Sequence, residues 1–77
     1  MTNEVSLRTL QPGDSAIITH IVANGEMGRR IRDMGLIPGA EVQVVGRAPL
    51  NDPVALRLKG FTLTLRNKEA DYISVQK

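Results

Sequence analysis

The fold is decided by residues 54–66, which read VALRLKGFTLTLR. On either side of Gly60–Phe61, apolar side chains alternate with polar or small ones, which is typical of two half-buried β-strands joined by a tight turn. Glycine in the first of two loop positions suits a type II′ turn. The stretch therefore predicts a β-hairpin with the cross-strand pairs Leu58–Leu63 and Leu56–Leu65.

Three segments outside this hairpin also predict strands. Residues 15–22 are rich in β-branched side chains, and residues 41–45 and 72–75 alternate apolar with polar positions. Turns rich in proline, glycine and asparagine separate these segments. Five short strands punctuated in this way predict an all-β fold, a small five-stranded barrel whose closure would leave no edge strand exposed.

One short helix is predicted between the first two strands, at residues 26–34. Met27, Ile31 and Met34 recur at helical spacing and define one apolar face. Gly35 suits the left-handed residue that commonly follows a helix end. The helix spans about two turns, so it needs packing against the barrel to persist.

Length and composition limit the functions that this chain can have. The 77 residues are enough for one small domain, and we take residues 1–77 as that domain. The chain has no cysteine and one histidine, which excludes disulfides and thiolate-bound zinc or iron–sulfur clusters. The net charge of +2, from 10 basic and 8 acidic residues, is too balanced for a chain built to neutralise nucleic-acid phosphates. We expect neither a cofactor nor a nucleic-acid partner.

The hydrophobicity pattern bears on location. No stretch approaches the about 20 apolar residues of a membrane span, and the N-terminal residues lack the apolar core of a signal peptide. Together with the absence of cysteine, this predicts a cytoplasmic protein without direct membrane insertion.

No arrangement of side chains predicts catalysis. His20 lies in mid-strand, on the predicted face of Ala16 and Ile18. Asp14 would be about 20 Å away along an extended chain. The glycines around the helix do not form a phosphate-binding loop. We therefore expect no enzyme, and no catalytic, cofactor-binding or metal-binding residue.

The predicted helix carries three arginines, Arg29, Arg30 and Arg32. On a helical wheel Arg30 and Arg32 lie about 160° apart, so the three point in different directions and cannot follow one phosphate backbone. Glu26 is placed to pair with Arg30 at i, i+4. Gly28 is expected to weaken the helix by about 1 kcal/mol relative to alanine. A solvated helix surface explains these arginines, and contact of one or two of them with a partner is the alternative.

Apolar side chains occupy turn positions that are usually polar: Leu36, Ile37, Leu50 and Phe61. They either fold back over the ends of the barrel or form an exposed docking patch. In a chain with no predicted active site, we take them as candidate partner-binding residues, together with Arg29, Arg30 and Arg32. The same apolar residues are also compatible with self-association.

Three stretches resemble signature motifs of the FeoA family of ferrous-iron transport proteins. Residues 30–39, RIRDMGLIPG, resemble R-L-x-(D/E)-M-G-L-x-P-G, and residues 47–54, RAPLNDPV, resemble R-A-P-L-G-D-P-(I/V). Residues 60–75 are similar to the family's G-(Y/F)-x-L-A-L-R ending with its following E-A and I-x-V. The resemblance covers nearly the whole chain. Asn51 stands where glycine is common, and asparagine tolerates the same left-handed turn.

This resemblance implies an SH3-like barrel and a cytosolic accessory role in Feo ferrous-iron uptake. The implied partner is FeoB, a membrane permease with a cytoplasmic GTP-binding domain, and neither catalysis nor a bound metal is implied. Our leading hypothesis is an adaptor that binds FeoB and modulates iron transport. In a narrower version, one helix arginine enters the GTP site of FeoB as an arginine finger.

Other hypotheses stay open on the sequence alone. One is a small barrel that binds nucleic acid, although the only aromatic residues are Phe61 and Tyr72. Another is a detached regulatory module like the SH3-like domain of DtxR-type repressors. A third is a metal sensor that uses the carboxylates of Asp52, Glu69 and Asp71, which would suit weak binding of a hard cation.

Overall fold

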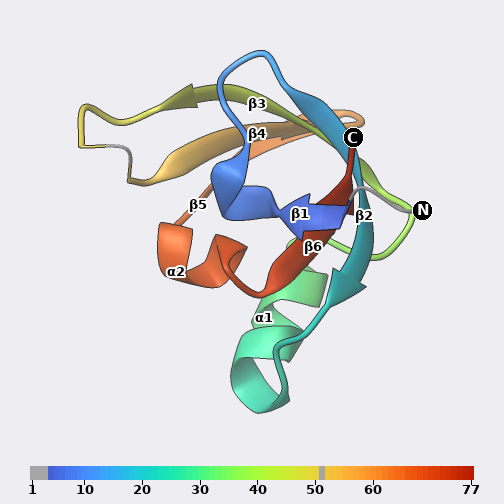
Figure 1. Cartoon of the computed structure of the whole chain (residues 1–77). Helices are drawn as coiled ribbons and strands as arrows, with labels where there is room; N and C mark the ends of the chain where they lie inside the picture. The colour runs from blue at the N-terminus through green and yellow to red at the C-terminus, as the bar shows by residue number, and fades with distance from the viewer. Residues whose placement is uncertain (1–3, 51) are drawn as a thin grey trace.

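A computed structural model of the chain describes residues 4–50 and 52–77. One six-stranded antiparallel sheet, ordered β1-β6-β2-β3-β4-β5, curves around a single core (Figure 1). The elements are β1 (Glu4–Ser6), the 3₁₀ turn η1 (Leu7–Thr9), β2 (Ser15–Ile21), α1 (Gly25–Asp33), β3 (Glu41–Arg47), β4 (Val54–Leu58), β5 (Phe61–Leu65), α2 (Asn67–Ala70) and β6 (Ile73–Gln76). Asn51, for which we predicted a turn, lies outside the described residues.

The mostly-β class and the position of the main helix are confirmed, whereas the strand count and the closure are wrong. The predicted five strands are β2 to β6, and α1 lies between the first two of them. β1 has three residues and so shows no period, and neither it nor η1 was predicted; the short turn predicted at residues 68–70 is the single helical turn α2. The hydrogen-bonded order ends at β1 and β5, so the described strands form a curved sheet with two edges.

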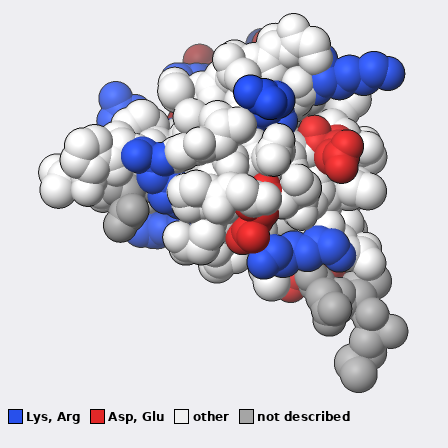
Figure 2. Space-filling model, turned by 90° about the horizontal axis from the view of Figure 1, so that it is seen from above, with Lys and Arg blue, Asp and Glu red and all other residues white. Residues whose placement is uncertain are grey.

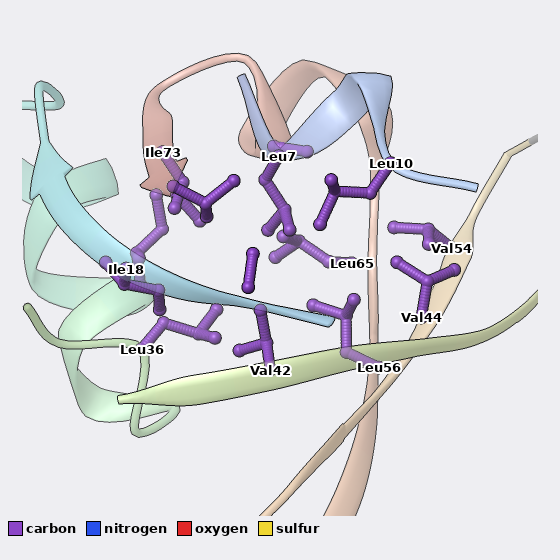
Figure 3. Close-up of a cluster of buried hydrophobic side chains, with 14 of the residues drawn as sticks. Leu7, Leu10, Ile18, Leu36, Val42, Val44, Val54, Leu56, Leu65 and Ile73 are labelled. Carbon is purple, nitrogen blue, oxygen red and sulfur yellow. The ribbon is translucent and has the colours of Figure 1, made fainter. Parts of the chain in front are cut away.

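The core is aliphatic and draws on both the sheet and the turns (Figure 3). The largest fully buried side chains are Leu7, Leu10, Ile18, Ile31, Leu36, Val42, Val44, Val54, Leu56, Leu65, Ile73 and Val75. The alternation predicted in residues 41–45 and 72–75 therefore places Val42, Val44, Ile73 and Val75 in the core. Leu7 begins η1, Leu10 directly follows it, and the two close the core from the side opposite β3 (Figure 3).

A β-bulge in β2 corrects the predicted position of His20. Ile18 pairs with Val75 and His20 with Ser74, so Thr19 is an extra residue in the ladder. The extra residue reverses which face each following side chain occupies. His20 consequently points to solvent, and its Nδ1 lies 2.9 Å from Glu4 Oε1 of β1. Ala16 and Ile18, before the bulge, share the buried face as predicted.

The β4–β5 hairpin is confirmed, but its register differs from the prediction by two residues. Leu58 pairs with Phe61 and Leu56 with Leu63, which leaves Lys59–Gly60 as the loop. Gly60 has φ +89° and takes the second loop position rather than the first. Because side chains alternate with a period of two, this shift keeps every predicted face. Phe61 thereby becomes a strand residue instead of a turn residue.

The half-buried guanidinium of Arg47, at the end of β3, joins three segments that are distant in sequence. It donates to the carbonyl oxygens of Arg8, at 2.6 Å, and Leu10, at 2.9 Å. It also donates to Asn67 Oδ1 of α2, at 2.9 Å. Hydrogen bonds from a charged donor are stronger than neutral ones, so Arg47 fixes η1 and α2 against the base of the loop at residues 48–53.

Candidate interaction surface

The structure separates the four apolar turn residues into one core residue and three surface residues. Leu36 is 0% exposed, whereas Ile37 is 49%, Phe61 46% and Leu50 89% exposed. The prediction that Leu36 forms part of an exposed patch is therefore wrong. The other three remain accessible to a partner.

Leu36 is buried because of the way α1 ends. The N–H of Leu36 donates to the carbonyl of Ile31, at 3.3 Å, and the N–H of Gly35 donates to that of Arg32, at 2.9 Å. This pair of bonds is a Schellman motif, in which the second residue past the cap commonly packs against the last turn of the helix. Gly35 has φ +94°, as the motif requires. Leu36 accordingly packs into the core with Ile31.

Phe61 borders a surface hollow beside this helix end. The hollow is lined by Gly35, Gly39 and Ala40 from the turns after α1, by β3 residues, and by Arg57, Leu58 and Lys59 from the hairpin. A Cβ added to Gly35 would lie 3.0 Å from Phe61 Cζ. The absence of a side chain at Gly35 thus lets the ring approach the chain while half of it stays in solvent.

Ile37 is held at the start of a tight turn. The N–H of Ala40 donates to the carbonyl of Ile37, at 3.0 Å, and Gly39 has φ +93°. With proline at the second position and glycine at the third, this is the pattern of a type II turn. The N–H of Gly39 donates to Ile18 of β2, at 2.7 Å, so the turn presents Ile37 from a fixed position on the sheet.

Leu50 occupies the loop between β3 and β4, which projects to the left in Figure 1. The base of this loop is closed by the N–H of Ala48, which donates to the carbonyl of Pro53 at 3.0 Å. The loop is therefore anchored at its base while Leu50 is the most exposed large apolar residue described. An exposed apolar side chain on an anchored loop is suited to insertion into a partner's pocket.

The three arginines of α1 are all exposed, as predicted. The predicted partner of Arg30 is wrong: its Nε lies 3.5 Å from Oε2 of Glu69 in α2, and no described ion pair joins it to Glu26. The Glu69 side chain is only 5% exposed and is fixed by the N–H of Arg66, at 3.0 Å from Oε1. Pairing of Arg30 with a carboxylate that is already fixed costs less side-chain entropy than pairing with the exposed Glu26.

Gly28, predicted only to weaken α1, has a packing role that sequence reasoning missed. It is buried, and a Cβ at this position would overlap the carbonyl oxygen of Ala23. The first turn of α1 therefore lies directly against the chain that leaves β2. A glycine in a helical pattern can mark such a close approach.

The carboxylates considered for metal binding are dispersed and engaged elsewhere. Asp52 Oδ1 accepts from the N–H of Asn67, and Asp71 Oδ2 pairs with Arg8 Nη1 at 2.9 Å. Within residues 4–50 and 52–77, no three histidine, cysteine, aspartate or glutamate side chains gather to hold an ion. The structure thus does not assemble the hard-cation site of the metal-sensor hypothesis.

Charge on the surface is mixed. Figure 2 shows lysine and arginine side chains in separate groups on this face, with aspartate and glutamate between them. A continuous basic band, which would track a phosphate backbone, is not visible from this side.

Within the part of the chain that the structure describes, neither helix has the length and apolar character to span a bilayer.

Comparisons of sequence and of structure with known proteins agree on one protein family. The model of the FeoA domain matches residues 5–77. The FeoA-like protein of Clostridium acetobutylicum shares 39% identity, with 97% of this chain and 87% of that chain covered and a TM-score of 0.89. The FeoA protein of Stenotrophomonas maltophilia, solved in complex with zinc and described as a prokaryotic SH3 domain protein, shares 28% identity over 92% of this chain and 88% of its own, with a TM-score of 0.79.

A curated relative has a different domain organisation. It is a fusion of Fe(2+) transport protein A with the Fe(2+) transporter FeoB from Porphyromonas gingivalis, 37% identical over 70 residues. The match covers 91% of this chain but only 8% of the fusion protein.

Proposed function

The chain belongs to the FeoA family of SH3-like, non-enzymatic ferrous iron transport accessory proteins, and from that premise we propose that it acts in the cytoplasm by binding the cytoplasmic part of FeoB and modulating iron uptake. The observation that carries this proposal is the relative in which the corresponding domain is fused to FeoB. A covalent fusion raises the effective concentration of one domain around the other. It therefore favours two domains that function in contact.

The proposed contact surface consists of Ile37, Leu50 and Phe61, with Arg29, Arg30 and Arg32 supplying charged contacts. Each of the three apolar side chains is substantially exposed while its backbone is held by the turn, loop base or strand described above. Rigid apolar anchors lose little conformational entropy on binding. Leu36 is excluded from this surface because it has no accessible area.

The test is titration calorimetry of this protein against the cytoplasmic region of FeoB, in nucleotide-free, GDP-bound and GTP-analogue states. If Leu50 is an anchor, Leu50→Ser should weaken binding by roughly tenfold or more, which corresponds to about 1.4 kcal/mol. Val22→Ser is the matched control, since Val22 is exposed and outside the proposed surface. Absence of binding in every nucleotide state, and to the full permease in detergent, would disprove the proposal.

A narrower version assigns an arginine-finger role to Arg29, Arg30 or Arg32. All three are exposed, and Arg30 would have to leave its ion pair with Glu69 to extend toward a partner. An arginine finger accelerates phosphoryl transfer by about 10³–10⁵ where it operates. GTP turnover by FeoB with and without this protein is the measurement. Unchanged turnover would eliminate the finger and leave the adaptor function intact.

A further inference from the structure

We propose that the free edge of β5 is a strand-addition site that binds an extended, acidic segment of a partner protein. In strand addition, backbone hydrogen bonds supply affinity and side chains supply selectivity. This goes beyond the proposed function, because it assigns a binding mode to a backbone edge that carries none of the exposed anchor side chains except Phe61. It does not depend on which protein contributes the segment.

The backbone of β5 offers hydrogen-bonding groups on its outer side. β4 is its neighbour in the sheet, and β5 ends the strand order of the described residues. A two-residue loop makes Leu58 and Phe61 a hydrogen-bonded pair, and bonded pairs alternate along an antiparallel ladder. Phe61, Leu63 and Leu65 therefore bond to β4. The N–H and C=O groups of Thr62 and Thr64 point away from it.

The edge lacks the features that usually prevent strand addition. Its sequence, FTLTL, contains no proline, glycine or charge, whereas natural edges are commonly protected by lysine, proline or bulges. The threonine side chains are exposed and β-branched, which favours an extended partner. The opposite edge, β1, has only three residues. β5 is therefore the edge with the greater capacity to accept a strand.

Basic residues surround this edge and define the charge of the occupant. Residues 54–66 contain Arg57, Lys59 and Arg66 and no acidic residue. Arg57 stands directly opposite Thr62, and Arg66 follows β5 at once. Arg30 of α1 lines the same surface hollow as Thr64 and Arg66. A segment laid along β5 would thus pass between basic side chains on two sides.

The acidic groups nearby are mostly committed to other contacts. Glu69 and Asp52 also line that hollow, but Glu69 accepts from the N–H of Arg66 and Asp52 from the N–H of Asn67. Glu41 lies at the other end, in the hollow that contains Arg57 and Lys59. Glu69 is also ion-paired with Arg30, so Arg57, Lys59 and Arg66 remain against the carboxylates of Asp52 and Glu41, a net excess of one positive charge along the edge. An acidic segment complements this excess.

A second copy of this chain fits less well. Antiparallel pairing of β5 with β5 would bring Arg66 of one copy beside Lys59 of the other. Like charges placed opposite each other in a sheet are destabilising. An acidic partner segment is therefore favoured over a symmetric dimer.

The probe is a synthetic peptide of about eight residues in which valine and glutamate alternate, with a valine–lysine peptide as the charge control. Amide hydrogen exchange of the full chain is followed by NMR during titration. We expect the acidic peptide to slow exchange at Thr62 and Thr64 by about tenfold or more at saturation, and the basic peptide to have no effect. No slowing at these two amides, or equal slowing by both peptides, would overturn the proposal.

Two variants separate backbone pairing from side-chain contact. Thr64→Pro removes an outward N–H, a change that edge strands tolerate, and it should abolish binding of the acidic peptide. Thr64→Val keeps the N–H and should bind as the wild type does. Peptide binding by the proline variant would refute strand addition, and slow exchange without peptide that grows with protein concentration would identify a second copy as the occupant. Loss of FeoB binding in Leu50→Ser with peptide binding intact distinguishes this site from the proposed function.

Discussion

Replacing Gly28 by alanine has two opposing effects on the free energy of unfolding, and the size of each is known. In an exposed helix the change stabilises by about 1 kcal/mol, because alanine has the higher helix propensity. Here Gly28 is buried, and the added Cβ would overlap the carbonyl oxygen of Ala23, a backbone atom that cannot rotate away. Relief of the overlap requires the first turn of α1 to move from the chain after β2, which also disturbs the burial of Ile31.

Inserting a methyl group into a packed site costs about 1–3 kcal/mol, and overlap with backbone places this site at the upper end. Subtracting the gain in helix propensity leaves a net destabilisation of about 2 kcal/mol. For a domain of this size the melting temperature should fall by roughly 8–16 °C.

The assay is urea unfolding followed by far-UV circular dichroism, since the chain has no tryptophan. Gly46→Ala is the matched control, because nothing lies within 4 Å of a Cβ at Gly46 and its φ is not positive. It should leave the free energy of unfolding within about 1 kcal/mol of the wild type. An increase in stability of Gly28→Ala would refute the close approach of α1 to Ala23.

Three further changes test other parts of the structure. Arg47→Met should lower the free energy of unfolding by about 3 kcal/mol or more in urea titrations, since it leaves the carbonyls of Arg8 and Leu10 and the side chain of Asn67 without this donor; a loss below about 1 kcal/mol would contradict the joining role. Leu36→Ala should cost about 2–5 kcal/mol as a core truncation, whereas Leu50→Ala should change stability by less than about 0.5 kcal/mol; equal effects would show that Leu36 is not in the core. The N–H of Gln11, and after it the ammonium of Lys77, lowers the pKa of Asp14 below the ordinary value of an aspartate. The contribution of this carboxylate to stability is therefore complete above its ordinary pKa and is lost as the pH falls through the lowered pKa. The melting temperature of the wild type should fall more steeply below about pH 4 than that of Asp14→Asn. Parallel curves for the two proteins would contradict this role of Asp14.

Much of the fold could be predicted from local pattern. The alternation in residues 54–66 and 41–45 predicted strands and faces that the structure retains, and Gly35 has the predicted left-handed conformation, although α1 ends at Asp33 and not at Met34. These features depend on side-chain period and on backbone conformations that glycine adopts easily. Both depend on residues that are close in sequence, so they can be predicted without knowledge of the tertiary structure.

The candidate surface could be predicted only in part. Ile37, Leu50 and Phe61 were recognised as apolar residues where polar ones are usual, and all three are exposed. Leu36 looked the same in sequence but is folded into the core by the Schellman motif. The local signal of this burial is the combination of a cap glycine with a following leucine.

The amino-acid sequence alone determined the class of the fold, the position of α1 to within one residue at each end, the inward faces of β3 to β6 and the family to which the chain belongs. Only the tertiary structure decided the pairing of β1 with β6, the outward turn of His20 after the bulge, the joining role of Arg47 and the tight fit at Gly28. The fit at Gly28 depends on how the short stretch between Ala23 and Gly28 turns from β2 into α1, whereas the other three depend on contacts between segments that are distant in sequence. Such contacts form only where chain closure brings distant backbone groups together, and no local pattern encodes that distance.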